Sequence, residues 1–307
     1  MPKSIPLKPF YRTAAVLLLL AAVSARGADD EKYEIRFDRP DAVGDKFKIE
    51  GEGAMIRRAG VVLDDKRREE DPVGAGIKLE GTLEVLAVTP KGKTTKLSVT
   101  VEQCNRVSGP DETELLPKGS VIIAEAVGND TKFSLKDGEL KPEASGLLEL
   151  LFHLSADDAR ATDDELFGTK EKQAVGSEWP MNAKRAAEDY AAEDVKVDAA
   201  DVGGTIKLEG VEKSGGAERL KVSGKMTVKK LQPNKPRLAG LPNVKEEGST
   251  EFRFTLKVPR DAADRSGEES IGAVHKMTST GTLPGGKTVK QEMTLERASQ
   301  MKRTLVK

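Results

Sequence analysis

Apolar residues recur at every second position along most of the chain after residue 30. This period of two predicts β-strands with one buried and one exposed face. Because one face of the runs stays polar, the pattern favours antiparallel sheets with a solvent-facing side over a buried parallel sheet. The clearest runs span 33–37, 47–55, 77–85, 97–101, 220–228, 252–258 and 289–295.

Turns and glycines divide these runs. Turn signals occur at Pro90-Lys91-Gly92, Asp137-Gly138, Ser214-Gly215-Gly216 and Pro284-Gly285-Gly286. Glycines also stand inside the runs, in phase with the apolar residues, where they offer no side chain to pack. Such glycines often mark bends or bulges, so they predict sheets that curve. The glycines concerned are Gly51, Gly53, Gly81, Gly210 and Gly224.

Two segments break the alternation and predict short helices. Leucines at 147, 150, 151 and 154 follow helical spacing, and Ser145 is the expected N-cap. Thr162-Asp163-Asp164-Glu165 has the pattern of a capping box, which opens a second helix. Alanines and Tyr190 over 183–191 predict a further helix, capped by Asn182.

Three pairs of segments suggest a weak internal repeat. Val43-Gly44-Asp45-Lys46-Phe47 resembles Val175-Gly176-Ser177-Glu178-Trp179. Ile77-Lys78-Leu79-Glu80-Gly81 recurs identically as Ile206-Lys207-Leu208-Glu209-Gly210. The third pair, Lys96-Leu97-Ser98-Val99 and Arg219-Leu220-Lys221-Val222, follows in the same order.

The repeat and the strand runs together predict a mainly β protein with two duplicated antiparallel halves. We expect the N-terminal half over 28–145 and the C-terminal half over 170–307, joined by a helical linker over 146–169. The sheets are expected to be curved, in a sandwich-like or half-barrel-like arrangement. Whether the halves form one sheet system or two domains stays open at this point.

The N-terminus has the pattern of a cleaved signal peptide over residues 1–27. Basic residues precede the uncharged run from Ala14 to Val23, and small residues allow cleavage after Ala25 or Gly27. That run is much shorter than the about 20 residues of a membrane-spanning helix, and no other run approaches this length. We therefore expect a periplasmic or secreted protein without a membrane span in the mature chain.

Val175-Gly176-Ser177-Glu178-Trp179-Pro180 stands between a leucine-rich and an alanine-rich segment. In this it resembles a group of uncharacterised exported β-rich bacterial proteins of planctomycete type, which share a Val-Gly-x-x-Trp segment near mid-chain. The resemblance implies an all-β secreted architecture. It brings no known activity, and no catalytic residue or cofactor to transfer.

Composition excludes several classes of function. The chain has 50 basic and 51 acidic side chains, so it lacks the positive charge that nucleic-acid binders show. Its only cysteine, Cys104, rules out an intrachain disulfide or a cysteine metal cluster. Its two histidines, His153 and His275, make a multi-histidine metal site improbable. We accordingly expect no catalytic residues, cofactor or metal, and no nucleic-acid partner.

One segment fits the phosphate-binding string G-x-x-x-x-G-K-[ST], namely Gly281-Thr282-Leu283-Pro284-Gly285-Gly286-Lys287-Thr288. Such a site needs a helix after the loop, whereas residues 289–295 alternate as a strand does. We therefore interpret the segment as a hairpin, like Pro90-Lys91-Gly92-Lys93-Thr94, and expect no nucleotide.

Other candidate residues have simpler structural interpretations. Glu149, His153 and Asp157 are spaced for one helix face and could be metal ligands, but a solvated face opposite the leucines is the simpler interpretation. Cys104 is expected to be a buried thiol. Trp179 aligns with Phe47 in the repeat and is expected to lie in the core.

Three classes of function remain. We expect first a non-catalytic structural or protein-binding role with an unknown partner in the cell envelope. The alternative is a carrier of an apolar ligand on a concave sheet, for which a cavity lined by Phe, Met and Leu would be the sign. The second alternative is a carboxylate-based hydrolase, for which a cleft with converging carboxyls of raised pKa would be the sign.

Overall fold

The computed structural model describes residues 31–306 apart from 65, 159, 215–216, 235–237 and 239. The expected signal peptide over 1–27, with its cleavage sites at Ala25 and Gly27, lies outside the described residues. Within the described part, none of the helices combines the length and the apolar character needed to cross a membrane.

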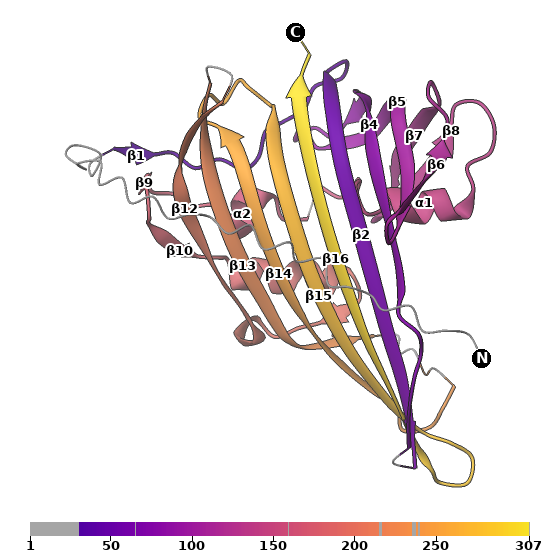
Figure 1. The fold of residues 1–307 in the computed structure, drawn as a ribbon. Helices are drawn as coiled ribbons and strands as arrows, with labels where there is room; N and C mark the ends of the chain where they lie inside the picture. Colours follow the sequence, from indigo (N-terminus) through magenta and orange to yellow (C-terminus); the bar gives the residue numbers. More distant parts are fainter. Residues whose placement is uncertain are drawn as a thin grey trace, which may run out of the picture.

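One antiparallel sheet of 14 strands dominates the fold and curves as it crosses the molecule (Figure 1). Its edges are β10 (Glu178–Pro180) and β8 (Asp130–Leu135). Between them, in sheet order, lie β12 (Val202–Ser214), β13 (Ala217–Pro233), β14 (Lys245–Pro259), β15 (Gly267–Thr282), β16 (Thr288–Leu305), β2 (Lys46–Leu63), β4 (Val73–Val88), β5 (Thr94–Ser108) and β7 (Val121–Val127). Short strands join at the sides: β11 (Val195–Lys196), β3 (Lys66–Glu69) and β6 (Asp111–Leu116). A separate pair consists of β1 (Lys32–Tyr33) and β9 (Gln173–Ala174).

The two β-rich halves share this sheet. The last strand, β16, pairs with β2 in an unbroken register from Val289 opposite Leu63 to Leu305 opposite Phe47. The sheet is therefore one continuous system, which the sequence left open. The predicted class, mainly β with curved antiparallel sheets and few helices, is confirmed.

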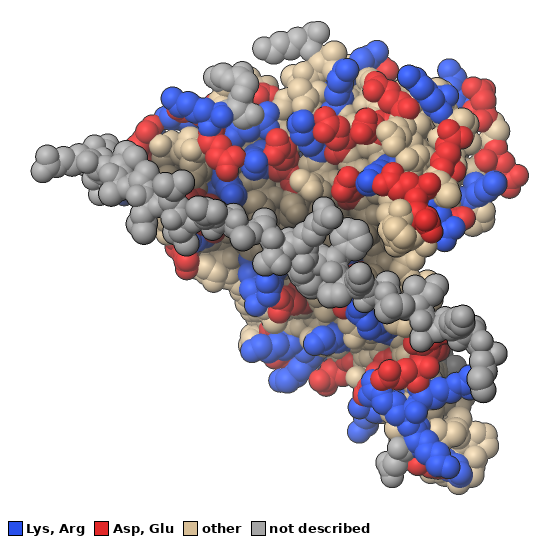
Figure 2. All heavy atoms as spheres, in the orientation of Figure 1, with Lys and Arg blue, Asp and Glu red and all other residues tan. Residues whose placement is uncertain are grey.

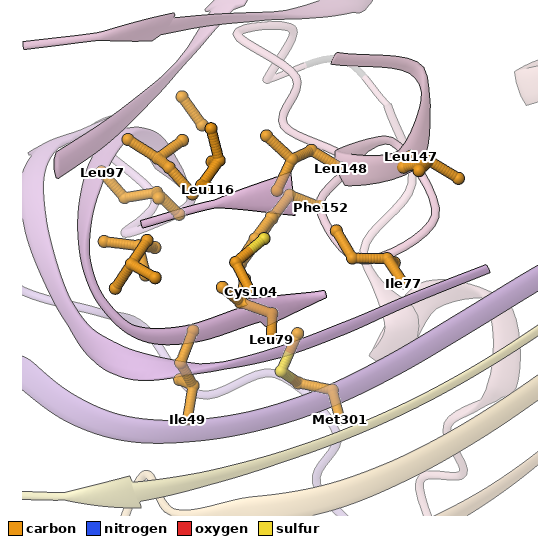
Figure 3. Packing of buried hydrophobic residues seen from close by; sticks show 14 of the residues in the cluster. Ile49, Ile77, Leu79, Leu97, Cys104, Leu116, Leu147, Leu148, Phe152 and Met301 are labelled. Carbon is orange, nitrogen blue, oxygen red and sulfur yellow. The ribbon is translucent and has the colours of Figure 1, made fainter. Parts of the chain in front are cut away.

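Two hydrophobic cores lie on the same face of the sheet, here called the inner face. The N-terminal core packs β2, β4, β5 and β7 against residues 147–154, and Figure 3 shows Leu79, Cys104 and Leu148 inside it. The C-terminal core packs β12, β13 and β14 against residues of α2 and α3. A row of register partners links the two cores across the inner face: Phe254, Ile271, Ser299, Gly53 and Ile77.

Two of the in-strand glycines make room for side chains on the inner face. A Cβ added at Gly224 would lie 2.3 Å from the ring of Phe254, and one added at Gly53 would lie 2.7 Å from Cβ of Leu150. At both positions the absence of a side chain permits this close packing. Gly81 and Gly210, in contrast, adjoin register shifts in the sheet, as expected for glycines at bulges.

The helices are α1 (Pro142–Leu148), α2 (Asp163–Phe167) and α3 (Ala183–Ala192), with a 3-10 turn at Ala199–Asp201. The predicted cap at Ser145 is wrong, because Pro142 fits the first turn and Lys141 becomes the N-cap. The capping box of α2 is confirmed, since the Thr162 side chain accepts from the backbone N–H of Glu165. Asn182 caps α3 as predicted.

The proposed repeat has mixed support in the register. Backbone N–H groups of Gly44 and Gly176 donate to carbonyls of Val85 and Leu208, over 2.9 and 2.7 Å, in equivalent turns. The identical segments 77–81 and 206–210, however, do not occupy equivalent positions. Trp179 pairs with Ile206, the first residue of its segment, whereas Phe47 pairs with Leu83, which lies beyond the end of segment 77–81. When one strand shifts along its neighbour by an even number of residues, each side chain stays on the same face of the sheet. The alternation of apolar residues alone therefore does not fix the register.

Candidate functional site

A cavity of about 470 Å³ lies on the inner face where the two cores meet. Its volume falls in the range of small-molecule sites. Both halves of the chain contribute apolar side chains to its wall: Phe37, Phe47, Ile49, Leu97, Leu150, Leu151, Leu256 and Met301. A neighbouring, more polar cavity of about 570 Å³ shares Arg39, Asp41, Thr94, His153, Leu154 and Asp163 with it.

Among the carboxyl groups that border this cavity, two have a raised pKa: Asp163 at the start of α2 and Glu269 on β15. Burial raises the pKa of Asp163 to about 6, and the charges of Asp38 and Glu269 add to this effect. Burial also raises the pKa of Glu269, with Arg303 acting in the opposite direction. The Asp163 side chain remains exposed to solvent where it borders the cavity. Nearby protein atoms and carboxylates therefore raise its pKa without removing it from water.

Asp163 is held in place by reciprocal hydrogen bonds between α2 and the segment before β2. Backbone N–H groups of Phe37 and Asp38 donate to the Asp164 carboxylate over 2.7 and 3.3 Å. Backbone N–H groups of Asp163 and Asp164 donate in turn to the Asp38 carboxylate over 3.2 and 3.1 Å. These bonds fix the first turn of α2 against residues 37–38, and so fix where the Asp163 side chain enters the cavity.

Two arginines border the same cavity. Arg39 donates to the carbonyl oxygens of Asp261 and Pro259 over 3.0 and 2.5 Å, and burial lowers its pKa. Its Nε is buried and has no hydrogen-bond partner among the described residues. Arg303 lies 3.6 Å from the Asp41 carboxylate and stacks over the Phe47 ring, 5.2 Å from its centroid.

The proposed metal-ligand triplet does not assemble on a helix. Because α1 ends at Leu148, Glu149 lies in the turn that follows, His153 and Asp157 lie in the irregular segment after it, and the three share no helix face. Glu149 and His153 both border the 470 Å³ cavity, whereas Asp157 does not. Across the described residues, no group of three or more His, Cys, Asp and Glu side chains is placed to hold a metal ion.

The hairpin interpretation of the phosphate-binding string is confirmed. The string connects β15 to β16, with the N–H of Leu283 donating to the Lys287 carbonyl over 2.8 Å. Thr89 and Lys93 form the same bond over 2.8 Å in the hairpin between β4 and β5. The string is followed by a strand, so it lacks the helix N-terminus of a phosphate cradle.

Cys104 and Trp179 lie in the cores, as predicted. Burial raises the pKa of the Cys104 thiol to about 11, so it stays protonated at neutral pH. Trp179 is buried, and its Nε1–H donates to the Phe167 carbonyl over 2.7 Å. Neither residue borders the cavity.

Sequence reasoning assigned Asp163 only to helix capping and did not single out Glu269. The sequence does contain a signal for Glu269. By the alternation of β15, Glu269 lies on the same face of the strand as Ile271, Ala273 and Met277. Its register partners, Leu256 and Met301, are both apolar. A carboxyl at an inward position between apolar register partners is the signal that marks Glu269.

The raised pKa of Asp163 predicts a pH-dependent stability. The folded chain binds this proton more tightly than the unfolded chain, whose value is near 3.8, so the carboxylate increasingly destabilises the fold from pH 4 to 6. We expect Asp163→Asn to raise the free energy of unfolding by about 1 kcal/mol, or Tm by about 2 °C, after screening by cavity water. Thermal unfolding should show this gain at pH 8 and little change at pH 4. A loss of stability at pH 8 would contradict it.

Comparison with known proteins gives low similarities. No protein-family profile and no curated protein matches the chain. A solved structure that describes lipid–protein interactions in lipovitellin has a TM-score of 0.25 and 10% identity, over 87% of this chain and 25% of that chain. A mutant porin from Rh. blastica has a TM-score of 0.16 and 11% identity, over 82% and 99%. This chain spans a quarter of the lipovitellin chain, and neither similarity establishes a shared fold or function.

Proposed function

We propose that this chain is an exported, non-catalytic binding protein that carries a small, largely apolar molecule. The observation that supports this is the cavity of about 470 Å³, whose wall combines Phe, Leu, Ile and Met side chains from both halves. A pocket with mainly apolar walls and a few polar groups is the usual form of a small-molecule site. Export rests on the signal-peptide pattern over residues 1–27.

We rank this role above a structural or protein-binding role in the cell envelope. Acidic and basic side chains are interspersed over the face shown in Figure 2. Such a surface suits a soluble protein and favours no particular partner. The cavity, in contrast, is a specific feature that requires residues from both halves of the chain.

A carboxylate-based hydrolase is the second candidate. Asp163 and Glu269 favour it, because paired carboxyls of raised pKa in a cavity are typical of acid–base catalysis. The wall of the cavity also carries apolar side chains from both halves, which a hydrolytic site does not require. A carrier of a largely apolar molecule requires both the apolar wall and polar groups in the cavity, so we rank the carrier role first.

Native mass spectrometry tests the carrier role. The mature chain, starting near Ala28, should be exported in a bacterial host and purified without detergent. We expect a species several hundred daltons heavier than the chain, which loses the extra mass under denaturing conditions. A bare chain mass would count against the carrier role.

A matched pair of variants localises the bound molecule. Ser299 borders the cavity on the inner face of β16, whereas Ser270 is exposed on the outer face of neighbouring β15. Ser299→Phe should fill part of the cavity and abolish the extra mass, while Ser270→Phe should retain it. Loss of the extra mass in both variants, or in neither, would contradict binding in this cavity.

A further inference from the structure

The charges that border the cavity are unbalanced once their ion pairs are taken into account. Lys257 lies 3.2 Å from Glu268, and Arg303 lies 3.6 Å from Asp41. Arg39 is the remaining basic side chain at full charge, and its guanidinium is already engaged by two backbone carbonyls. On the acidic side, three carboxyls remain: Glu149, Asp163 and Glu269.

Two of these carboxyls have no direct partner, Glu269 half-buried and Asp163 open to solvent at the border of the cavity. Among the described residues, the side-chain oxygens of Asp163 and Glu269 make no hydrogen bond and no ion pair within 4.0 Å. Withdrawing a carboxylate even partly from water without a partner is costly. A binding partner that supplies positive charge and N–H donors would remove this cost.

Resting on the proposed carrier function, we propose that the cavity takes an apolar molecule with one cationic amine head, which lies between Asp163 and Glu269. The apolar body would lie along Phe47, Leu151 and Met301. At about 30 Å³ for each non-hydrogen atom, about 470 Å³ accommodates roughly fifteen such atoms. A twelve-carbon alkylamine has this size.

The charge balance distinguishes an amine from the other common head groups. An ammonium group offers three N–H donors and a full positive charge to the two carboxylates. An anionic head would add a further negative charge beside the two carboxylates and would be repelled. A neutral hydroxyl head would gain a hydrogen bond but would leave the carboxylate charges uncompensated.

Binding of the amine should strengthen as the pH rises from 5 to 7. The charged groups that face Asp163 are Asp38, Asp164, Glu269 and Lys93, and the group that faces Glu269 is Arg303. With the pKa of Asp163 at about 6, about one tenth of these side chains are ionised at pH 5 and about nine tenths at pH 7. The affinity for the amine should therefore rise about tenfold over this interval.

Three probes with the same chain and different heads test the inference: dodecylamine, dodecanol and dodecanoate. Isothermal titration calorimetry with delipidated protein at pH 7 should give an affinity for dodecylamine at least about tenfold above that for the others. Tighter binding of dodecanoate, or equal binding of all three, would overturn the cationic head while leaving the carrier role intact. No binding of any probe, together with a bare chain mass, would overturn both.

Variants of the two carboxyls provide the second arm. Asp163→Asn and Glu269→Gln should each weaken dodecylamine binding about tenfold and leave dodecanol binding unchanged. Asp163→Asn should also remove the rise in affinity between pH 5 and 7, a readout that a merely structural role would not change. Glu80→Gln, at an exposed outer-face position of β4, is the control and should retain wild-type affinity. Undiminished amine binding in both cavity variants would overturn the inference.

Discussion

Replacing Trp179 by alanine is expected to lower the free energy of unfolding by about 3–5 kcal/mol, the usual cost of removing a large buried aromatic side chain. Trp179 is 6% exposed and packs in the C-terminal core. It lies on the edge strand β10, where its backbone pairs with Ile206 of β12. Because β10 pairs with β12 alone, the indole in the core adds to the backbone bonds that hold this edge strand in place. Urea denaturation followed by far-ultraviolet circular dichroism measures the change.

Trp179→Phe separates the hydrogen bond of the indole from its packing. Phenylalanine keeps much of the apolar area but leaves the Phe167 carbonyl without its donor. We expect a cost of about 1–3 kcal/mol, which is the penalty for an unsatisfied buried polar group together with a smaller ring. If Trp179→Ala costs less than about 1 kcal/mol, the edge strand is held by other contacts and the interpretation is wrong.

The alternation of apolar residues predicted the strands best where the sheet is covered on one face only. The run at 97–101 lies within β5, and its apolar side chains are buried in the N-terminal core. The run at 47–55 covers only part of β2, which continues to Leu63. Beyond residue 55 this strand extends past the core and both of its faces are partly exposed. The difference in polarity between its two faces is therefore smaller there.

Helical spacing gave a less accurate result near the cavity. Residues 150–154 keep the spacing of leucines expected for a helix, yet α1 ends at Leu148. Leu150 and Leu151 instead lie in turns that face the sheet, where Gly51 and Gly53 allow them to approach closely. A set of leucines with a few matching intervals does not distinguish a helix from turns that bury the same side chains.

The candidate site could not be predicted from the sequence because its parts meet only through the fold. Asp163 follows a capping Thr, and that local role fully accounts for its place in the sequence. Glu269 belongs to β15, a strand whose alternation is interrupted by polar side chains such as His275. The pairing of β14, β15 and β16 places Glu269 between Leu256 and Met301, and the bonds of Asp38 place Asp163 beside it.

Gly53→Val is expected to displace the wall of the cavity and to lower the free energy of unfolding by about 1–3 kcal/mol. A Cβ at this position would lie 2.7 Å from Cβ of Leu150 and 3.3 Å from Cδ2 of Leu151. The first of these atoms is next to the backbone, so rotation of a side chain cannot relieve the contact. The segment after α1 would have to move away from β2, and both leucines border the cavity.

Gly272→Val is the matched control for this prediction. Gly272 lies on β15, separated from β2 by β16, and on the opposite face of the sheet. A Cβ added there meets no atom within 4 Å. Valine is favoured in strands over glycine, so this variant should be as stable as the parent chain or slightly more stable. Both stability and dodecylamine affinity should fall in Gly53→Val and persist in Gly272→Val. Equal behaviour of the two variants would mean that the leucine segment is not held against β2, and the cavity would then lack the fixed apolar wall on which ligand binding depends.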